Sequence, residues 1–183
     1  MGHLRLVSSV PSAPTTESAC ISAFDRELDY IFAALRRLGA SPHEVEDLAQ
    51  ELFVILNRNW QSIDHSSPLR PYLFGIAFRI VSASRRRRSR EVLLENVDAN
   101  DDTLSPEGAL QSKQAVKLLL AALETVPLSR RAVIIMHDLD EIPIADIARN
   151  LNITRFGAYA RLAKGRNELA AAVRRLLRGR AHP

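Results

Sequence analysis

Apolar residues recur at steps of three and four along most of this chain, a spacing that a helix can bury on one face and a strand cannot. Seven apolar residues form the first stripe: Ile21, Phe24, Leu28, Ile31, Phe32, Leu35 and Leu38. Gly39 follows directly, and glycine is the residue type that most often ends a helix. This pattern predicts a helix up to Gly39, and its repetition predicts an all-α fold.

Two further helices are predicted in the N-terminal half. Ser41 precedes Glu44 by three residues, which is the spacing of a capping box at a helix start. An apolar stripe then runs from Val45 to Leu56, and a third helix is predicted from Pro68. Its buried stripe would be Leu69, Leu73, Ile76, Ala77 and Ile80. Three helices of this length can close one small core, so residues 19–92 are predicted to form a domain.

The second half begins after a segment without periodicity. Residues 98–112 hold four acids and no base, and residues 93–112 are expected to be a flexible acidic linker. Residues 1–18 are expected to be a disordered lead-in. In residues 113–179, helices are predicted before Pro127, after it, from Pro143 and from Thr154. A short helix, a brief turn and a longer basic helix predict a helix-turn-helix.

Composition narrows the classes of function. Cys20 is the only cysteine, which excludes an internal disulfide and a thiolate metal cluster. No apolar run approaches the roughly 18–20 residues that span a membrane, so a cytoplasmic protein without membrane insertion is expected. Residues 113–183 hold thirteen Lys and Arg against six Asp and Glu. That excess indicates either an anionic partner or a solvated surface.

The second helix of the predicted helix-turn-helix carries candidate DNA contacts. Its inward positions are small or aliphatic, and five larger polar or basic side chains lie elsewhere on it: Arg155, Tyr159, Arg161, Lys164 and Arg166. The major groove of DNA admits one helix, and guanidinium groups bind phosphate well. An ordinary helical hairpin with a solvated basic face is the alternative.

The second predicted helix of the N-terminal half carries acids on one face, and three interpretations compete. Glu44, Asp47 and Glu51 could ligate a metal, but no Glu-x-x-His partner motif occurs on another helix. Acids in a first turn also suit the helix dipole. Finally, a basic partner surface could dock on Asp47, Gln50, Glu51 and Phe53.

The third predicted helix joins aromatic and basic residues. Phe74 and Phe78 alternate with arginines, which suits stacking on a nucleic-acid strand, although both rings could instead widen the core stripe. The helix then runs into Arg85, Arg86, Arg87 and Arg88. A helix dipole accounts for one or two cations. Four in succession point around the whole helix, so phosphate contacts are predicted.

Several segments, in this order, resemble the extracytoplasmic-function (ECF) group of sigma-70-type sigma factors: VEDLAQELF, LRPYLFGIAFRI running into RRRR, a linker, IADIARNLNI and YARLAKGRNEL. The resemblance covers about residues 21–178. It implies a sigma-2-like bundle of three or four helices and a sigma-4-like helix-turn-helix. Such a protein has no enzymatic activity, cofactor or metal, and binds core RNA polymerase through its clamp helices and flap. Promoter DNA and an anti-sigma factor are the other implied partners.

The resemblance also implies roles for particular residues. Asp47, Gln50 and Glu51 match residues that contact the polymerase clamp, and the loop 63–68 matches one that holds a flipped base of the −10 element. The expected −10 contacts are Ile63, Asp64, His65, Ser66, Arg70, Phe78, Arg79, Arg85, Arg86, Arg87 and Arg88. The expected −35 contacts are Arg155, Tyr159, Ala160, Arg161, Ala163, Lys164 and Arg166.

The chain departs from the family at several of these places. Tyr72, Arg79 and Ala83 stand where the family often has Trp, Asn and Asp, and Pro143 replaces a capping Ser. These departures affect which promoter sequence the chain would recognise, and not the family that it resembles. The main alternative function is a stand-alone helix-turn-helix regulator with an N-terminal dimerisation or sensing domain. A carboxylate-metal enzyme is a more distant alternative.

Overall fold

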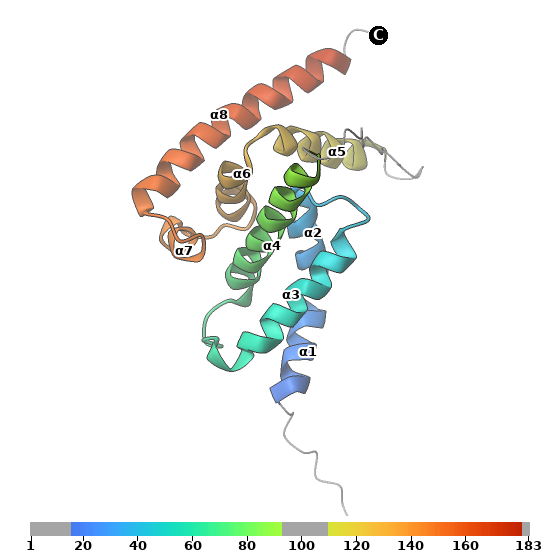
Figure 1. Cartoon of the computed structure of the whole chain (residues 1–183). Coiled ribbons are helices and arrows are strands. Elements are labelled where there is room, and N and C mark those ends of the chain that lie inside the picture. The colour runs from blue at the N-terminus through green and yellow to red at the C-terminus, as the bar shows by residue number, and fades with distance from the viewer. Residues whose placement is uncertain (1–15, 93–109, 181–183) are drawn as a thin grey trace, which may run out of the picture.

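The computed structural model describes residues 16–92 and 110–180, and every regular element in these ranges is helical (Figure 1). The helices are α1 (Thr16–Arg26), α2 (Leu28–Leu38), α3 (Val45–Asn59), α4 (Leu69–Val92), α5 (Leu110–Thr125), α6 (Leu128–Ile134), α7 (Ile144–Asn150) and α8 (Arg155–Arg180). A 3-10 turn, η1 (Trp60–Ser62), follows α3, and a π-helical turn, η2 (Ile135–Leu139), continues α6. The all-α prediction is confirmed. Among the described helices, none combines the length and apolarity needed to cross a membrane.

Helices α1 to α4 form the N-terminal bundle, in which α2 and α3 both pack on α4. The first predicted helix is in fact two, because Glu27 leaves the helical region with φ −102° and ψ 6°. The predicted stripe is buried at Ile31, Leu35 and Leu38, whereas Ile21 is exposed. The predicted burial is therefore confirmed at these positions of α2 and is wrong at Ile21 of α1.

Helices α5 to α8 form the C-terminal unit, in which α8 packs along α5, α6 and α7. The helix α5 begins at Leu110, inside the segment expected to be linker. The rest of that linker and nearly all of the lead-in lie outside the described residues. The predicted cap of α8 is confirmed, since the Thr154 hydroxyl accepts a hydrogen bond from Gly157 N at 3.0 Å. Asn152, at φ 51°, makes the turn between α7 and α8.

The two units pack against each other across an interdomain interface. Helix α2 contacts α5 and α6, and α4 contacts α7. Buried apolar side chains of both units belong to one continuous cluster. Helices α4 and α7 approach closely at Gly75, where a Cβ would lie 3.4 Å from the carbonyl oxygen of Asn150. We call this arrangement, in which the two units are in contact, the closed arrangement. It is stabilised by apolar packing as well as by the polar contacts described next.

The C-terminal end of α2 is the first polar contact of this interface. Gly39 ends α2 at φ 93°, and Ala40 N donates to the carbonyl of Leu35, as in a Schellman motif. Arg131 of α6 donates to the carbonyl of Leu38 at 2.9 Å. Arg85 of α4 donates to the carbonyl of Gly39 at 3.3 Å. Two cations therefore meet the negative end of the α2 dipole.

Arg131 is fully buried at this point. Besides Leu38, its guanidinium donates to the carbonyls of Glu124 at 2.6 Å and Val126 at 3.1 Å. Burial, aided by the charge of Arg85, lowers the pKa of Arg131 to about 10. The side chain is therefore still protonated at neutral pH, and its charge is balanced by carbonyl groups at the ends of α2 and α5.

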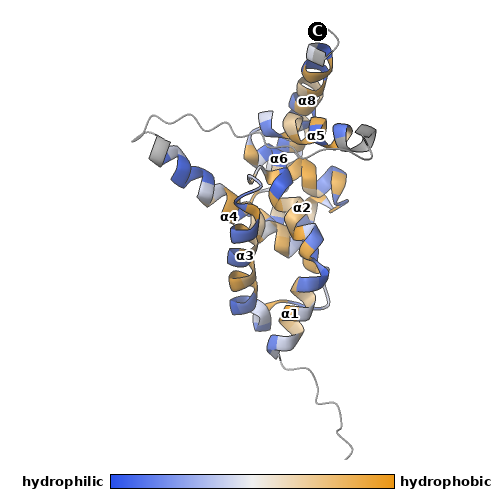
Figure 2. Cartoon of the chain, turned by 90° about the vertical axis from the view of Figure 1, so that its right-hand side faces the viewer, coloured by the Kyte–Doolittle hydropathy of each residue, from blue (hydrophilic) through white to orange (hydrophobic). Residues whose placement is uncertain are grey.

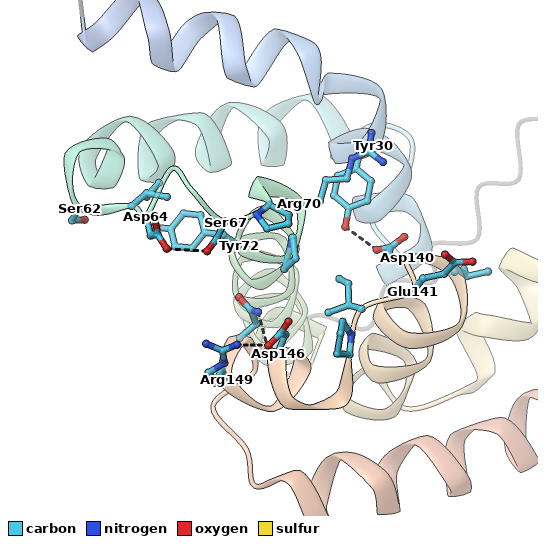
Figure 3. A pocket seen from close by; sticks show the side chains of 17 residues that line it. Tyr30, Ser62, Asp64, Ser67, Arg70, Tyr72, Asp140, Glu141, Asp146 and Arg149 are labelled. Atoms are coloured by element: carbon cyan, nitrogen blue, oxygen red, sulfur yellow. Dashed lines mark hydrogen bonds and ion pairs between the residues drawn. The ribbon is translucent and has the colours of Figure 1, made fainter.

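Tyr30 of α2 and Asp140, directly after η2, make the second polar contact across the interface. The Tyr30 hydroxyl donates to the Asp140 carboxylate at 2.7 Å (Figure 3), and Arg37 lies 3.5 Å from the same carboxylate. Burial raises the pKa of Asp140, and the Tyr30 hydrogen bond only partly opposes that rise. Burial and this hydrogen bond together raise the pKa of Tyr30.

Candidate interaction surfaces

The outer face of α3 is the first candidate surface. Asp47, Gln50 and Glu51 are all exposed there. Val54, which is 44% exposed, lies on the same face at the i+7 position from Asp47. Val54 was not among the predicted contacts, although it continues the three-and-four spacing from Asp47, Gln50 and Glu51. This face combines two carboxylates, one amide and one apolar side chain.

Phe53 lies elsewhere on α3. Its ring packs edge-on against Phe24, with ring centroids 5.0 Å apart and planes at 66°. The side chain is only partly buried, but it packs against the core cluster. The structure therefore does not bring Phe53 together with the three polar residues.

Glu44 is held by two neighbours. Its carboxylate accepts hydrogen bonds from the Ser41 backbone N at 2.9 Å and hydroxyl at 2.7 Å, and it pairs with Arg88 of α4. Burial alone would raise the pKa of Glu44, but the bonds from Arg88 and Ser41 outweigh it and lower the pKa to about 2. Within residues 16–92 and 110–180, no group of three or more His, Cys, Asp and Glu side chains is arranged to hold a metal ion.

The loop from η1 to α4 has a conformation fixed by its own side chains. Asp64 accepts hydrogen bonds from the backbone N of Ser66 at 3.0 Å and from the hydroxyls of Ser66 and Ser67. These bonds, that of the Ser66 hydroxyl first, lower the pKa of Asp64. His65 stacks on the buried Trp60, with ring centroids 4.5 Å apart. The loop is thus exposed but anchored to the end of α3.

The predicted contacts along α4 have different environments. Phe74 is fully buried, so it belongs to the core, and Phe78 is half-buried against that core. Arg79 is exposed. Arg70 donates to Glu27 at 2.7 Å and lies over the ring of Tyr30, 5.1 Å from its centroid. Arg79 is therefore the most available of these side chains.

The arginine cluster at the end of α4 divides into two pairs. Arg85 is engaged with the end of α2, and Arg88 with Glu44. Arg86 and Arg87 are exposed, on turns of α4 that project from the body of the molecule and are strongly hydrophilic (Figure 2). All four were expected to contact phosphates, but the structure shows that two of them also fasten α4 to the bundle.

A pocket of about 800 Å³ lies at the interdomain interface (Figure 3). One wall is the loop 62–68 with the first turn of α4, and the other is the segment 139–150. Arg70 and Asp140 line it, as does the ion pair between Arg149 and Asp146. The pocket thus places the candidate −10 loop opposite the first helix of the helix-turn-helix.

The outer face of α8 is the last candidate surface, and we define it as Phe156, Tyr159, Ala160, Ala163 and Lys164. All five side chains are exposed. Phe156 is 83% exposed and Tyr159 61%. Phe156 was not among the predicted contacts, although it precedes Tyr159 and Ala160 by three and four residues.

The predicted arginines border this outer face. Arg155 is exposed and Arg161 is partly buried. Arg166 donates through Nε to Asp138 of η2 at 2.9 Å. That bond lowers the pKa of Asp138 and ties the middle of α8 to η2. Asp138 was not among the predicted site residues, because nothing in its local sequence marks it as a partner of α8.

Comparison with known proteins identifies two family regions in this chain. Residues 23–91 match sigma-70 region 2, and residues 117–169 match sigma-70 region 4. The chain is 26% identical over 159 residues to the ECF RNA polymerase sigma factor SigW of Bacillus subtilis, covering 81% of this chain and 85% of SigW. It is also 26% identical over 165 residues to the ECF RNA polymerase sigma factor SigE of Mycolicibacterium smegmatis, covering 85% of this chain and 63% of SigE.

Solved structures share the fold. The sigma factor RpoE of Bartonella quintana, in complex with the anti-sigma factor NepR, superposes with a TM-score of 0.67 at 23% identity, covering 84% of this chain and 98% of RpoE. CnrH, in complex with the cytosolic domain of CnrY, gives 0.58 at 19% identity, covering 84% of this chain and 86% of CnrH. With regions 2 and 4 in the family order and ECF relatives matched across most of its length, the chain belongs to the ECF group of sigma-70-type RNA polymerase sigma factors.

Proposed function

We propose that this chain binds core RNA polymerase and directs it to promoters, with the N-terminal bundle at the −10 element and the helix-turn-helix at the −35 element. The observation that carries this proposal is the presence of regions 2 and 4, in that order, in one chain. The chain would act in the cytoplasm, where its polymerase and DNA are, without a cofactor or an enzymatic activity of its own.

The outer face of α3 is the proposed polymerase contact. Its carboxylates, Asp47 and Glu51, suit a basic helical surface, and Val54 adds an apolar contact that can be buried at the centre of an interface. Asp47→Ala combined with Glu51→Ala should weaken binding to core polymerase and leave the circular dichroism unchanged. The matched control is Asp25→Ala with Asp29→Ala, which removes the same charge from exposed sites on α1 and α2.

The −10 element is the proposed ligand of the loop 63–68 and of α4. A base held by the loop must leave its stack, which costs roughly a few kcal/mol. Phosphate contacts from Arg79, Arg86 and Arg87 would help to offset that cost. Replacing Arg86 and Arg87 with Ala should reduce the slope of log K against log salt by about 0.7–0.9 per arginine. Unchanged slopes would contradict this role.

The closed arrangement has a consequence for promoter binding. The −35 and −10 elements are roughly 25 base pairs apart, or about 85 Å along the DNA at about 3.4 Å per base pair. Because the two units contact each other, we infer that they separate when both elements are bound. A partner that holds them together would then block initiation, and an anti-sigma factor is the proposed partner of this kind. The related RpoE structure is a complex with an anti-sigma factor, NepR.

Run-off transcription with purified core polymerase tests the proposal as a whole. Adding the chain should give starts at defined promoters, which core polymerase alone does not give. If no template in a genomic fragment library yields a specific start, the sigma-factor proposal is wrong. Specific binding of the free chain to duplex DNA in the same experiments would then favour the stand-alone regulator.

A further inference from the structure

Phe156 is unusual among the side chains that the structure describes. It is the most exposed of their large apolar side chains, at 83%, and the next is Tyr159 at 61%. A phenyl ring in water forgoes the stabilisation that burial gives. Both rings lie in the first two turns of α8, whereas the remaining exposed large apolar residues are spread over other elements and, in the case of Leu177, the far end of α8. An apolar cluster of this kind indicates a binding surface.

The position of Phe156 on α8 follows from helix geometry. Successive side chains turn by about 100°, so the outer face of α8, from Tyr159 through Phe156 to Lys164, spans an arc of about 140°. The buried residues Ala158 and Leu162 lie on the opposite side. Phe156 is therefore at the N-terminal end of the outer face and points directly away from the core. In a helix-turn-helix, the first turns of the second helix contact the bases.

Basic side chains border the outer face on both sides. By the same rotation of about 100° per residue, Arg155 and Arg166 lie along one edge and Arg161 along the other. An apolar strip between two rows of guanidinium groups matches the major groove, where phosphates line both walls and base edges form the floor. Arg166 already pairs with Asp138, but a purely apolar protein surface would offer Arg155 and Arg161 no counter-charge. The charge pattern therefore selects duplex DNA as the occupant.

One group on the floor of the major groove is apolar, the 5-methyl of thymine, and Phe is among the side chains that contact it. A phenyl ring has no hydrogen-bond donor or acceptor, so it cannot distinguish bases by their polar edges. Ala160 and Ala163 on the same face are also apolar. We propose that Phe156 determines −35 specificity by packing on a thymine 5-methyl group. This inference rests on the proposed sigma-factor function.

The test combines a protein change with the removal of one methyl group from the DNA. A −35 sequence is first selected from a randomised promoter library with the holoenzyme of core polymerase and the full chain. Each selected thymine is then replaced in turn by deoxyuridine, which lacks only the 5-methyl. One such replacement should weaken wild-type binding about fourfold, the equivalent of one buried methylene. The F156A holoenzyme should bind the two DNAs equally.

Two variants serve as controls. Phe156→Leu keeps an apolar side chain and should retain most of the preference for thymine over deoxyuridine. Arg161→Ala should weaken binding to every sequence by a similar factor and keep that preference, as expected for a phosphate contact. Because Phe156 is exposed, F156A should unfold at the wild-type urea concentration, which separates a loss of recognition from a loss of folding.

Three outcomes would overturn the inference. They are a selected −35 sequence without thymine, equal binding of thymine and deoxyuridine DNA by the wild type, and an undiminished preference in F156A. If F156A lost a protein partner and kept its promoter binding, its preference for thymine would also be undiminished, which is the third outcome. In each case, specific initiation by the wild-type holoenzyme would show that the sigma-factor proposal still holds. The absence of any specific start would contradict that proposal instead.

Discussion

The interdomain interface and the outer face of α8 depart from the usual distribution of side chains in opposite directions. At the interface, the guanidinium of Arg131 is fully buried, and the Asp140 carboxylate side chain is only 7% exposed. On α8, the ring of Phe156 is 83% exposed. Most buried side chains are apolar and most exposed ones polar, so both regions call for a physical explanation.

The difference lies in whether each unusual group has a partner within the chain. Arg131 donates to three backbone carbonyls, and no buried side-chain nitrogen or oxygen within the described ranges lacks a hydrogen-bond partner. The buried polar groups are thus accounted for by folding and by the closed arrangement. None of the described helices covers the outer face of α8, so we attribute this face to a partner molecule. Substitutions should therefore change stability at the interface and DNA binding on α8.

The largest effect is expected for Arg131→Met. Methionine fills much of the space but leaves three carbonyls without the donor that they have in the wild type, and each unsatisfied buried acceptor is costly. The free energy of unfolding should fall by roughly 2–4 kcal/mol, as measured by urea denaturation. The exposed Arg174→Met is the control and should change it by less than about 0.5 kcal/mol. Equal stability of the two variants would show that the buried guanidinium is not required.

Gly39→Ala tests the same interface from the other side. The positive φ disfavours alanine, and a Cβ would overlap the guanidinium groups of both Arg85 and Arg131. A loss of about 1–3 kcal/mol is expected in the same denaturation experiment. Gly179→Ala in α8 is the control, because a Cβ there meets nothing within 4 Å and should be neutral or slightly stabilising. A wild-type midpoint for Gly39→Ala would mean that the arginines move aside easily.

The sequence predicts the helices far better than the interdomain interface. Gly39 as a helix end and the Thr154 cap are local patterns, and the structure confirms them. The capping box is found only in part: the Ser41 backbone N donates to the Glu44 carboxylate, but α3 begins at Val45 and the Ser41 hydroxyl donates to Glu44 and does not cap the helix. Arg131 follows Arg130, and no local pattern distinguishes the two. Yet Arg131 is buried against Leu38, while Arg130 forms a surface pair with Glu168. Such contacts join residues about a hundred positions apart, which periodicity cannot detect.

The candidate surfaces were predicted in part. The resemblance indicated Tyr159, Ala160, Ala163 and Lys164, and the structure leaves these side chains exposed on one face. Reasoning from the residues themselves expected Phe53 to contact a partner and left open whether Phe78 would do so or widen the core stripe, and both rings pack against the core. An aromatic side chain beside an apolar stripe can pack on the core with that stripe or point to solvent. The choice depends on neighbours such as Phe24, which the sequence does not place.

A smaller effect is expected for Lys164→Ala on the outer face of α8. Binding of the holoenzyme to a −35 element should weaken by about 1–3 kcal/mol if Lys164 contacts a base edge, which is the discrimination that one good base contact provides. The urea midpoint should not change, since the side chain is exposed. Gel-shift titrations on matched and altered −35 sequences measure the effect. A loss of equal size on every sequence would reassign Lys164 to a phosphate.

The smallest effect concerns pH and two carboxylates only two residues apart. Asp138 has a pKa lowered chiefly by Arg166, so its stabilising contribution is present at neutral pH and is lost as the pH falls below about 4. Asp140 has a pKa raised by burial, against the opposing effects of Tyr30, Arg37 and Arg70. Its contribution is full below about pH 4 and is lost as the pH rises through the raised pKa.

The two carboxylates should therefore respond differently to loss of charge. Asp140→Asn should be tolerated at pH 7 and should flatten the dependence of stability on pH between 7 and about 4. Asp138→Asn should cost up to about 1 kcal/mol at pH 7, since its pair with Arg166 is at the surface, and should become neutral only in stronger acid. Urea midpoints at pH 7, 5 and 3.5 measure both variants. Parallel dependences of the urea midpoint on pH for the two variants would contradict this prediction. They would show that the pKa values of Asp138 and Asp140 are not shifted in opposite directions.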